Sequence, residues 1–179
     1  KDHYTYAHSQ RVKDYVVTLA QALGLPTDAV NRLSAAALLH DIGKIGVRDS
    51  ILTKSGALTT EEFEEVKTHP RLAVAIISNV PSLAPCVPAI LYHHERFDGT
   101  GYPQGLKGED IPLEARILAV PDCLADMTAD RSYRPALDWE EAMDEITRHS
   151  GSQFDPNIAK VFVALMESGA IPRPSKTAR

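Results

Sequence analysis

Two adjacent pairs of residues in this sequence carry side chains that bind transition-metal ions. The pairs are His40-Asp41 and His93-His94, and each lies near the predicted C-terminal end of an apolar helical segment. Neighbouring residues on a helix point about 100° apart. Both members of a pair therefore serve one site only where that site lies at the helix end or holds two metal ions.

Three more side chains of the same types project from other predicted helices, namely His8, His69 and Asp122. With the two pairs they make five imidazoles and two carboxylates, a combination that suits Fe, Mn, Zn or Ni better than Mg or Ca. The set is too large for one octahedral ion and suits two ions that share an aspartate. Two metal ions about 3.5–4 Å apart are a recurring arrangement for phosphoester hydrolysis, and this is the chemistry that the set predicts. A single histidine is more often structural. The prediction therefore depends on the occurrence of His40-Asp41-Ile42-Gly43-Lys44 together with His93-His94-Glu95 in one sequence.

The composition limits the class of protein. The chain has 179 residues, of which 44% are hydrophobic, enough for one domain with a core. No apolar run approaches the roughly 18 residues of a membrane span. The net charge of −5 argues against nucleic-acid binding but allows a small anionic ligand. The two cysteines, Cys86 and Cys123, are too few for a disulfide framework and favour reduced thiols in a cytoplasmic protein.

The apolar spacing is helical nearly throughout, which predicts an all-α domain. One stripe runs from His8 to Leu23, and a second helix, capped by Thr27, carries His40. The following helix starts at Thr59, which has capping-box spacing with Glu62, and is expected to reach His69. Later helix starts are indicated at Pro70, Val87, Pro112, Asp138 with Glu141, and Asp155 with Pro156.

The stretch 95–113 is the one long irregular segment, and its glycines and prolines favour a fixed, turn-rich path. A loop of this length in a compact domain is usually functional or disordered. Within it, Glu95 and Asp98 are expected to orient the loop and the histidines instead of binding metal. Towards the C-terminus the sequence becomes rich in Pro, Lys and Arg, so we expect a domain over residues 1–167 and a flexible tail over residues 168–179.

Three segments together resemble the HD-GYP family, a branch of the HD phosphohydrolases. They are His40-Asp41-Ile42-Gly43-Lys44-Ile45-Gly46, His93-His94-Glu95-Arg96-Phe97-Asp98-Gly99-Thr100-Gly101-Tyr102-Pro103, and Asp130-Arg131-Ser132-Tyr133-Arg134. The likeness extends from about Asp2 to Phe162. It implies a single helical HD-type bundle with a long Gly-rich loop and a bi- or trinuclear iron or manganese centre. It also implies an enzyme that hydrolyses the bacterial second messenger cyclic di-GMP to linear pGpG and often on to GMP.

The resemblance implies a role for individual residues. The metal ligands carried over by motif position are His8, His40, Asp41, His69, His93, His94 and Asp122. In the implied mechanism Asp41 bridges two ions, and a bridging hydroxide attacks phosphorus in line with the departing 3′-oxygen. Lys44 reaches the substrate phosphate, so Asp41 and Lys44 are the implied catalytic residues. Tyr102, Arg131 and Arg134 match positions that contact the ligand, where guanidinium groups fit phosphate and guanine.

Two departures from the family pattern change these expectations. Members with a third metal carry Glu four residues before the first histidine ligand; this chain has Tyr4 there, so we predict a dinuclear site. The usual Val-Ala-Asp-x-x-Asp-Ala-Met-Thr becomes Val120-Pro121-Asp122-Cys123-Leu124-Ala125-Asp126-Met127-Thr128. The second carboxylate is shifted by one position, which rotates it by about 100° on a helix. We also expect a kink at Pro121. The shift and the kink together should affect the catalytic rate more than metal binding.

Other functions stay open at this point. One is an HD-type hydrolase of another cyclic dinucleotide, such as cyclic GMP-AMP. Another is a weakly active or inactive cyclic-dinucleotide-binding and protein-interaction module, which Ala125 favours. The resemblance implies diguanylate cyclase (GGDEF) domains as partners of the Gly-Tyr-Pro loop, and a receiver or sensor domain before Lys1. We expect no nucleic-acid partner, no membrane segment and a cytoplasmic location.

Overall fold

Helices joined by turns make up most of the chain, and the computed structural model describes residues 3–130 and 135–174. The α-helices are α1 (His3–Ala22), α2 (Thr27–Leu39), α3 (Asp49–Leu52), α4 (Thr60–Val66), α5 (His69–Ile77), α6 (Val87–Tyr92), α7 (Leu113–Met127), α8 (Trp139–Arg148) and α9 (Pro156–Glu167). The 3-10 helices are η1 (Ile42–Gly46), η2 (Pro81–Cys86) and η3 (Gly108–Asp110). The described residues contain no β-strand and one isolated bridge, between Ser150 and Phe154. The predicted all-α fold class is confirmed.

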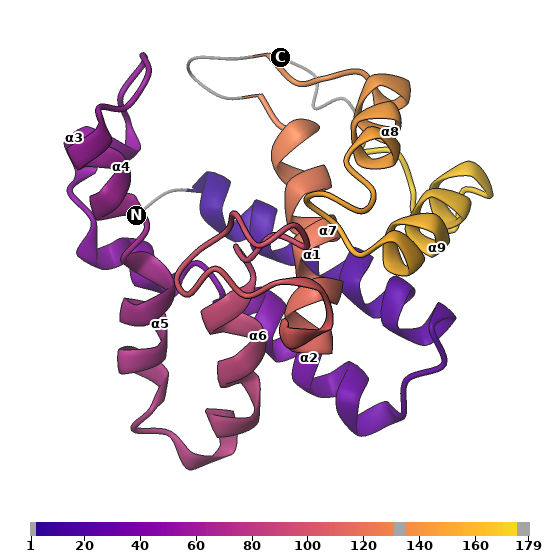
Figure 1. Cartoon of the computed structure of the whole chain (residues 1–179), viewed down its shortest axis with the longest axis horizontal. Coiled ribbons are helices and arrows are strands. Elements are labelled where there is room, and N and C mark those ends of the chain that lie inside the picture. The colour runs from indigo at the N-terminus through magenta and orange to yellow at the C-terminus, as the bar shows by residue number, and fades with distance from the viewer. Residues whose placement is uncertain (1–2, 131–134, 175–179) are drawn as a thin grey trace.

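The core lies where α1 packs against α2 and α7. Figure 1 shows these three helices in the middle of the molecule, with α3 to α6 on one side and α8 and α9 on the other. The predicted stripe of α1 is buried, since Val16 and Leu19 are fully covered, and they share one apolar cluster with Leu33 of α2 and Leu118 of α7. Burying a side chain of this size contributes about 1.5–3 kcal/mol. The core therefore fixes the helices that carry the histidines.

Three predicted helix starts are confirmed by their capping hydrogen bonds. Thr59 and Asp138 form capping boxes with Glu62 and Glu141. The Asp155 carboxylate accepts hydrogen bonds from the first amides of α9, which begins at the following proline. In each case the side chain satisfies main-chain donors that the first helical turn leaves without partners.

Two expected helix boundaries are wrong. Thr27 is the first residue of α2, and Pro26 holds the cap position without a side-chain hydrogen bond. Helix α4 ends at Val66, so it does not reach His69, which instead opens α5 with Pro70 in the first turn. Proline is well suited to the first turn because the N–H groups of that turn have no acceptor within the helix, so the N–H that proline lacks is not needed. A new helix therefore begins here, and the histidine lies at its start.

Helix α7 continues through Pro121, which is buried within it. A proline inside a helix removes one main-chain hydrogen bond, but the helix runs unbroken from Leu113 to Met127. Asp122 and Asp126 therefore both project from one continuous helix, four residues apart.

The loop between α6 and α7 is held by its own polar contacts. Glu95 is buried, and its carboxylate accepts hydrogen bonds from the amides of Gln104 at 2.7 Å and Leu106 at 3.1 Å. Asp98 accepts hydrogen bonds from the amide and the hydroxyl of Thr100, at 3.0 and 2.6 Å. The two carboxylates thus orient the loop, as the sequence predicted.

Two glycines allow the backbone to approach other segments closely. A Cβ atom at Gly43 would lie 1.9 Å from the carbonyl oxygen of His69, and one at Gly101 would lie 2.3 Å from the amide nitrogen of Arg96. Neither separation admits a side chain. Gly43 lets η1 pack directly against the start of α5, and Gly101 lets the loop fold back onto its own beginning.

The segment after α9 contacts the core. Ile171 is 1% exposed, and the Tyr15 hydroxyl donates a hydrogen bond to the carbonyl oxygen of Pro172 at 3.3 Å. The first part of the tail predicted over 168–179 is therefore packed, and its last part, 175–179, lies outside the described residues. Among the helices of the described ranges, none is both long and apolar enough to cross a membrane.

Candidate metal centre

The seven predicted metal ligands come together where five helices meet. They are His8 in α1, His40 and Asp41 after α2, His69 at the start of α5, His93 and His94 after α6, and Asp122 in α7. Six of them are buried, with exposed fractions from 0 to 8%, and His94 is partly buried. Several triplets within this set have ligand atoms close enough to hold one ion, including His69 with His93 and His94.

The two aspartates lie between the histidines. Asp122 Oδ1 is 3.1 Å from Nε2 of His8 and 3.3 Å from Nε2 of His40. Asp41 Oδ2 is 3.6 Å from Nε2 of His40, and Asp41 Oδ1 is 3.5 Å from Nε2 of His69. The two oxygens of Asp41 therefore face histidines from different helices, which is the orientation that a bridging carboxylate requires.

Main-chain carbonyls orient three of the histidine rings. The Nδ1 atoms of His40, His69 and His93 lie 2.7–2.8 Å from carbonyl oxygens three residues earlier, in Ala37, Val66 and Ile90. Because a carbonyl oxygen only accepts, Nδ1 carries the proton and donates in each case. The Nε2 atom of each ring therefore faces the centre and carries no proton when the ring is neutral, and this arrangement is typical of metal-bound histidine.

Several buried polar atoms at the centre have no hydrogen-bond partner within the described part of the chain. They include the Nε2 atoms of His40, His69 and His93, and Oδ1 of Asp41. A buried polar atom without a partner costs about 1–3 kcal/mol, so such atoms rarely gather without a reason. Imidazole nitrogens and carboxylate oxygens are ligands that iron, manganese and zinc accept. The residues present therefore fit a bound metal.

Burial and charge set the protonation states of the centre. Burial lowers the pKa of His93 far below its usual range and that of His94 to about 3, so both imidazoles are neutral, as metal binding requires. Burial alone would lower the pKa of His40 too, but the carboxylates of Asp41 and Asp122 raise it to about 9. Positive charge is thus stabilised between the two carboxylates, where a divalent cation would be stabilised in the same way.

A family model for the HD domain matches residues 1–158. The chain belongs to the HD domain family. The predicted resemblance to its HD-GYP branch is confirmed by curated relatives that align over most of this HD domain.

The chain is similar to curated relatives and to a solved structure over most of its length. A cyclic di-GMP phosphodiesterase of Thermotoga maritima is 41% identical over 167 residues, which cover 92% of this chain and 45% of that protein. The 3′3′-cGAMP-specific phosphodiesterase 2 of Vibrio cholerae is 34% identical, over 89% of this chain and 31% of that protein. Bd1817, an HDG"Y"P protein from Bdellovibrio bacteriovorus, has the same fold, with a TM-score of 0.74, 19% identity, and coverage of 91% of this chain and 52% of that one. This chain thus spans less than half the length of these curated relatives.

Lys44 lies at the edge of the centre of this HD domain. Its ammonium nitrogen donates to Asp41 Oδ2 at 2.6 Å, and about a third of its side chain, 31%, is exposed. Burial on its own raises the pKa of Asp41, but Lys44 and His40 outweigh it and hold that pKa below its usual range. Lys44 therefore keeps the carboxylate ionised while its exposed side faces a second cavity, of about 470 Å³.

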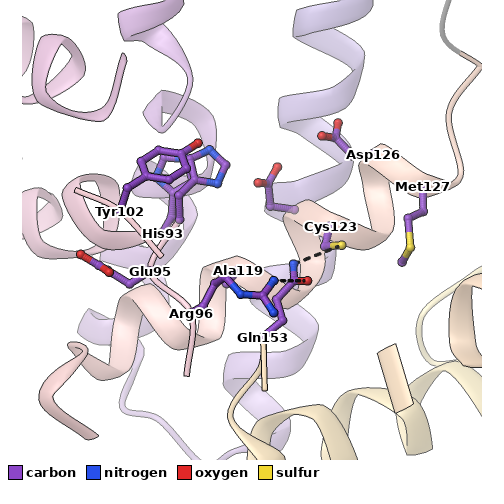
Figure 2. Close-up of a pocket in the computed structure, with 11 residues that line it drawn as sticks. His93, Glu95, Arg96, Tyr102, Ala119, Cys123, Asp126, Met127 and Gln153 are labelled. Atoms are coloured by element: carbon purple, nitrogen blue, oxygen red, sulfur yellow. Dashed lines mark hydrogen bonds between the residues drawn. The ribbon is translucent and has the colours of Figure 1, made fainter. Parts of the chain in front are cut away.

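A cavity of about 440 Å³ opens beside the histidines of the HD domain. Figure 2 shows Tyr102 and His93 on one side of it and Asp126 on the other. The Tyr102 ring lies against His94, with ring centroids 4.8 Å apart. Burial raises the pKa of Tyr102, so its hydroxyl keeps its proton and can donate a hydrogen bond. Of the predicted ligand-contacting residues, Arg131 and Arg134 lie outside the described residues.

Sequence reasoning missed part of the cavity wall. Arg96 and Gln153 both line it, and the Arg96 guanidinium donates a hydrogen bond to Gln153 Oε1 at 2.9 Å (Figure 2). Arg96 lies within a recognised motif, but Gln153 is 57 residues away in the α8–α9 turn and no local pattern points to it. His149, which matches no motif, pairs with Glu145 at 3.3 Å instead of joining the centre.

Proposed function

We propose that this HD domain is a metal-dependent phosphodiesterase that hydrolyses cyclic di-GMP to pGpG. The observation that supports it most is the convergence of five imidazoles and two carboxylates on one buried point, with ring nitrogens aimed inward by main-chain carbonyls. The relative from Thermotoga maritima, named as a cyclic di-GMP phosphodiesterase, adds support for the substrate.

Two divalent ions, iron or manganese, would be held by this set. One group of ligands is Asp122 with the two histidines beside its Oδ1 atom, His8 and His40. The other is His69, His93 and His94, with Asp41 between the two groups. When bound, a pair of such ions lowers the pKa of water and neutralises the charge of a phosphoryl group. The side chain of Tyr4 is not described, so the argument for two ions in place of three depends on its residue type.

The surrounding residues of the chain bind and orient the substrate in this proposal. Lys44 offers its ammonium group to a phosphate oxygen at the edge of the centre, next to Asp41. Tyr102 donates a hydrogen bond from its hydroxyl group to another phosphate oxygen from the cavity side. Arg131 and Arg134 are proposed on the resemblance alone as contacts to phosphate and guanine.

Partners and location also belong to this proposal. The Gly-Tyr-Pro loop, residues 101–103, would be the surface that contacts diguanylate cyclase (GGDEF) domains. A regulatory domain would precede residue 1 in the full-length protein, which would act in the cytoplasm.

Chromatography of the products tests the proposed activity. The protein is incubated with Mn(II), or anaerobically with Fe(II), and with cyclic di-GMP, cyclic GMP-AMP or cyclic di-AMP in parallel. We expect cyclic di-GMP to give pGpG, and Asp41→Ala to give none. Cleavage of cyclic GMP-AMP with cyclic di-GMP left intact would overturn the proposed substrate. Binding of either nucleotide without turnover would favour an interaction module, and equal turnover by Asp41→Ala would indicate a contaminant.

A further inference from the structure

His8 is oriented differently from the other histidines of the centre. The rings of His40, His69 and His93 are held by main-chain carbonyls near helix ends. His8 lies inside α1, where the carbonyl oxygens already accept the hydrogen bonds of the helix. Side chains from another helix lie beside its ring.

Two carboxylates of α7 lie beside the two ring nitrogens of His8. Asp122 Oδ1 is 3.1 Å from Nε2, and Asp126 Oδ1 is 3.4 Å from Nδ1. Residues four apart share one face of a helix, and α7 packs against α1. Figure 2 shows Asp126 on the same helix as Cys123 and Met127, at the wall of the cavity.

A neutral imidazole carries one N–H and donates to one of the two carboxylates only. Asp122 is also 3.3 Å from His40 and belongs to the inner ligand set, whereas Asp126 is partly exposed, with 43% of its side chain accessible. When the proton is on Nδ1, the ring donates its hydrogen bond to the outer carboxylate, that of Asp126. Nε2 is then free of a proton and lies on the side of the other inward-facing nitrogens, which is the state a metal ligand needs.

We propose that Asp126 is a positioning residue whose carboxylate accepts the Nδ1 proton of His8 and holds Nε2 towards the metal centre. The inference rests on the proposed function, because it assumes that the centre binds metal. It also explains the shifted carboxylate of this sequence. At position 126 the carboxylate lies 3.4 Å from Nδ1 of His8, whereas the residue at the usual family position, Ala125, is fully buried in the core.

The measurement is the affinity of the full chain for Mn(II) alone, by calorimetric titration after removal of bound metal with a chelator. Loss of a hydrogen-bond partner behind a metal-bound histidine typically costs about 10–100-fold in metal affinity. We expect this loss for Asp126→Ala and a smaller one for Asp126→Asn, whose amide oxygen still accepts from Nδ1. Asp144→Ala, which removes the same charge from an exposed position on α8, is the matched control and should not change the affinity.

A double-mutant cycle distinguishes positioning from a general effect of charge or folding. If Asp126 acts through His8, Asp126→Ala should weaken Mn(II) binding in the unaltered chain and have almost no further effect beside His8→Ala. Equal losses in both backgrounds, or no loss in either, would overturn the inference while leaving the proposed function intact. A lower number of bound ions in Asp126→Ala would make Asp126 a direct ligand and also overturn it. If the unaltered chain binds no Mn(II), the metal centre itself is refuted.

Discussion

The histidine centre and the cavity wall beside it are built from different kinds of structure. Ligand candidates such as His40 and His93 lie on or next to helices whose apolar faces are in the core, and main-chain carbonyls set their rings. The wall residues Arg96 and Tyr102 lie on a long loop, which is held by hydrogen bonds that include those to the buried carboxylate of Glu95. The centre therefore depends on the packing of the whole bundle, and the loop part of the wall depends on individual hydrogen bonds.

The largest expected effect is at the centre. Asp41→Ala removes the carboxylate that faces both His40 and His69, and it should lower turnover of cyclic di-GMP by on the order of a thousandfold or more. Metal content should fall with it. Steady-state kinetics and metal analysis of the same sample check this. Full metal content and full activity in Asp41→Ala would show that the histidine centre is not the active site.

The second effect separates packing from chemistry. Gly43→Ala places a Cβ 1.9 Å from the His69 carbonyl oxygen, so η1 and α5 must move apart, with an expected loss of about 3 kcal/mol in the free energy of unfolding. Urea unfolding followed by circular dichroism measures it. Gly56→Ala is the control, because its Cβ would meet nothing within 4 Å. Similar stabilities for the two variants would contradict the close approach of η1 to α5.

A third, intermediate effect is expected in the wall. Glu95→Ala leaves the amides of Gln104 and Leu106 without their acceptor, at about 0.5–1.5 kcal/mol for each lost hydrogen bond. The loop should exchange its amide hydrogens faster and KM should rise, while metal content and the unfolding of the bundle stay nearly unchanged. Hydrogen-exchange mass spectrometry checks this, with Glu109→Ala, an exposed change in the same loop, as the control. Loss of metal from Glu95→Ala would show that the two regions are not independent.

The smallest effect concerns one hydroxyl group. Tyr102→Phe keeps the ring that lies against His94 and removes the proton donor. One hydrogen bond is worth about 0.5–1.5 kcal/mol, so kcat/KM should fall by roughly 2- to 10-fold. Tyr6→Phe, on a side chain that is 68% exposed, should have no effect. An unchanged kcat/KM in Tyr102→Phe would assign this tyrosine a structural role.

The difference between the centre and the wall also explains which features could be predicted from the sequence. Residue types and helical spacing were enough to single out His8, His69 and Asp122, because a few buried imidazoles and carboxylates are conspicuous in an apolar pattern. Thr59 and Asp138 marked helix starts through capping boxes that depend on local sequence alone. These features are local, and the fold class follows from them.

Contacts between distant segments could not be predicted in this way. Gln153 reaches the cavity only because the α8–α9 turn lies against the loop after α6, where its carbonyl oxygen accepts a hydrogen bond from the amide of Phe97. The start of a new helix at His69 depends on Pro70 and on the packing of η1 against α5. The shift from Ala125 to Asp126 was visible in the sequence, but its meaning required the position of α1 relative to α7.

Metal analysis of the protein purified without chelators and without oxygen tests the central claim most directly. The account predicts two equivalents of iron or manganese per chain, and their loss on His69→Ala, whose Nε2 faces Asp41 in the centre. A chain that carries no metal after this treatment, or that keeps both equivalents in His69→Ala, would contradict it.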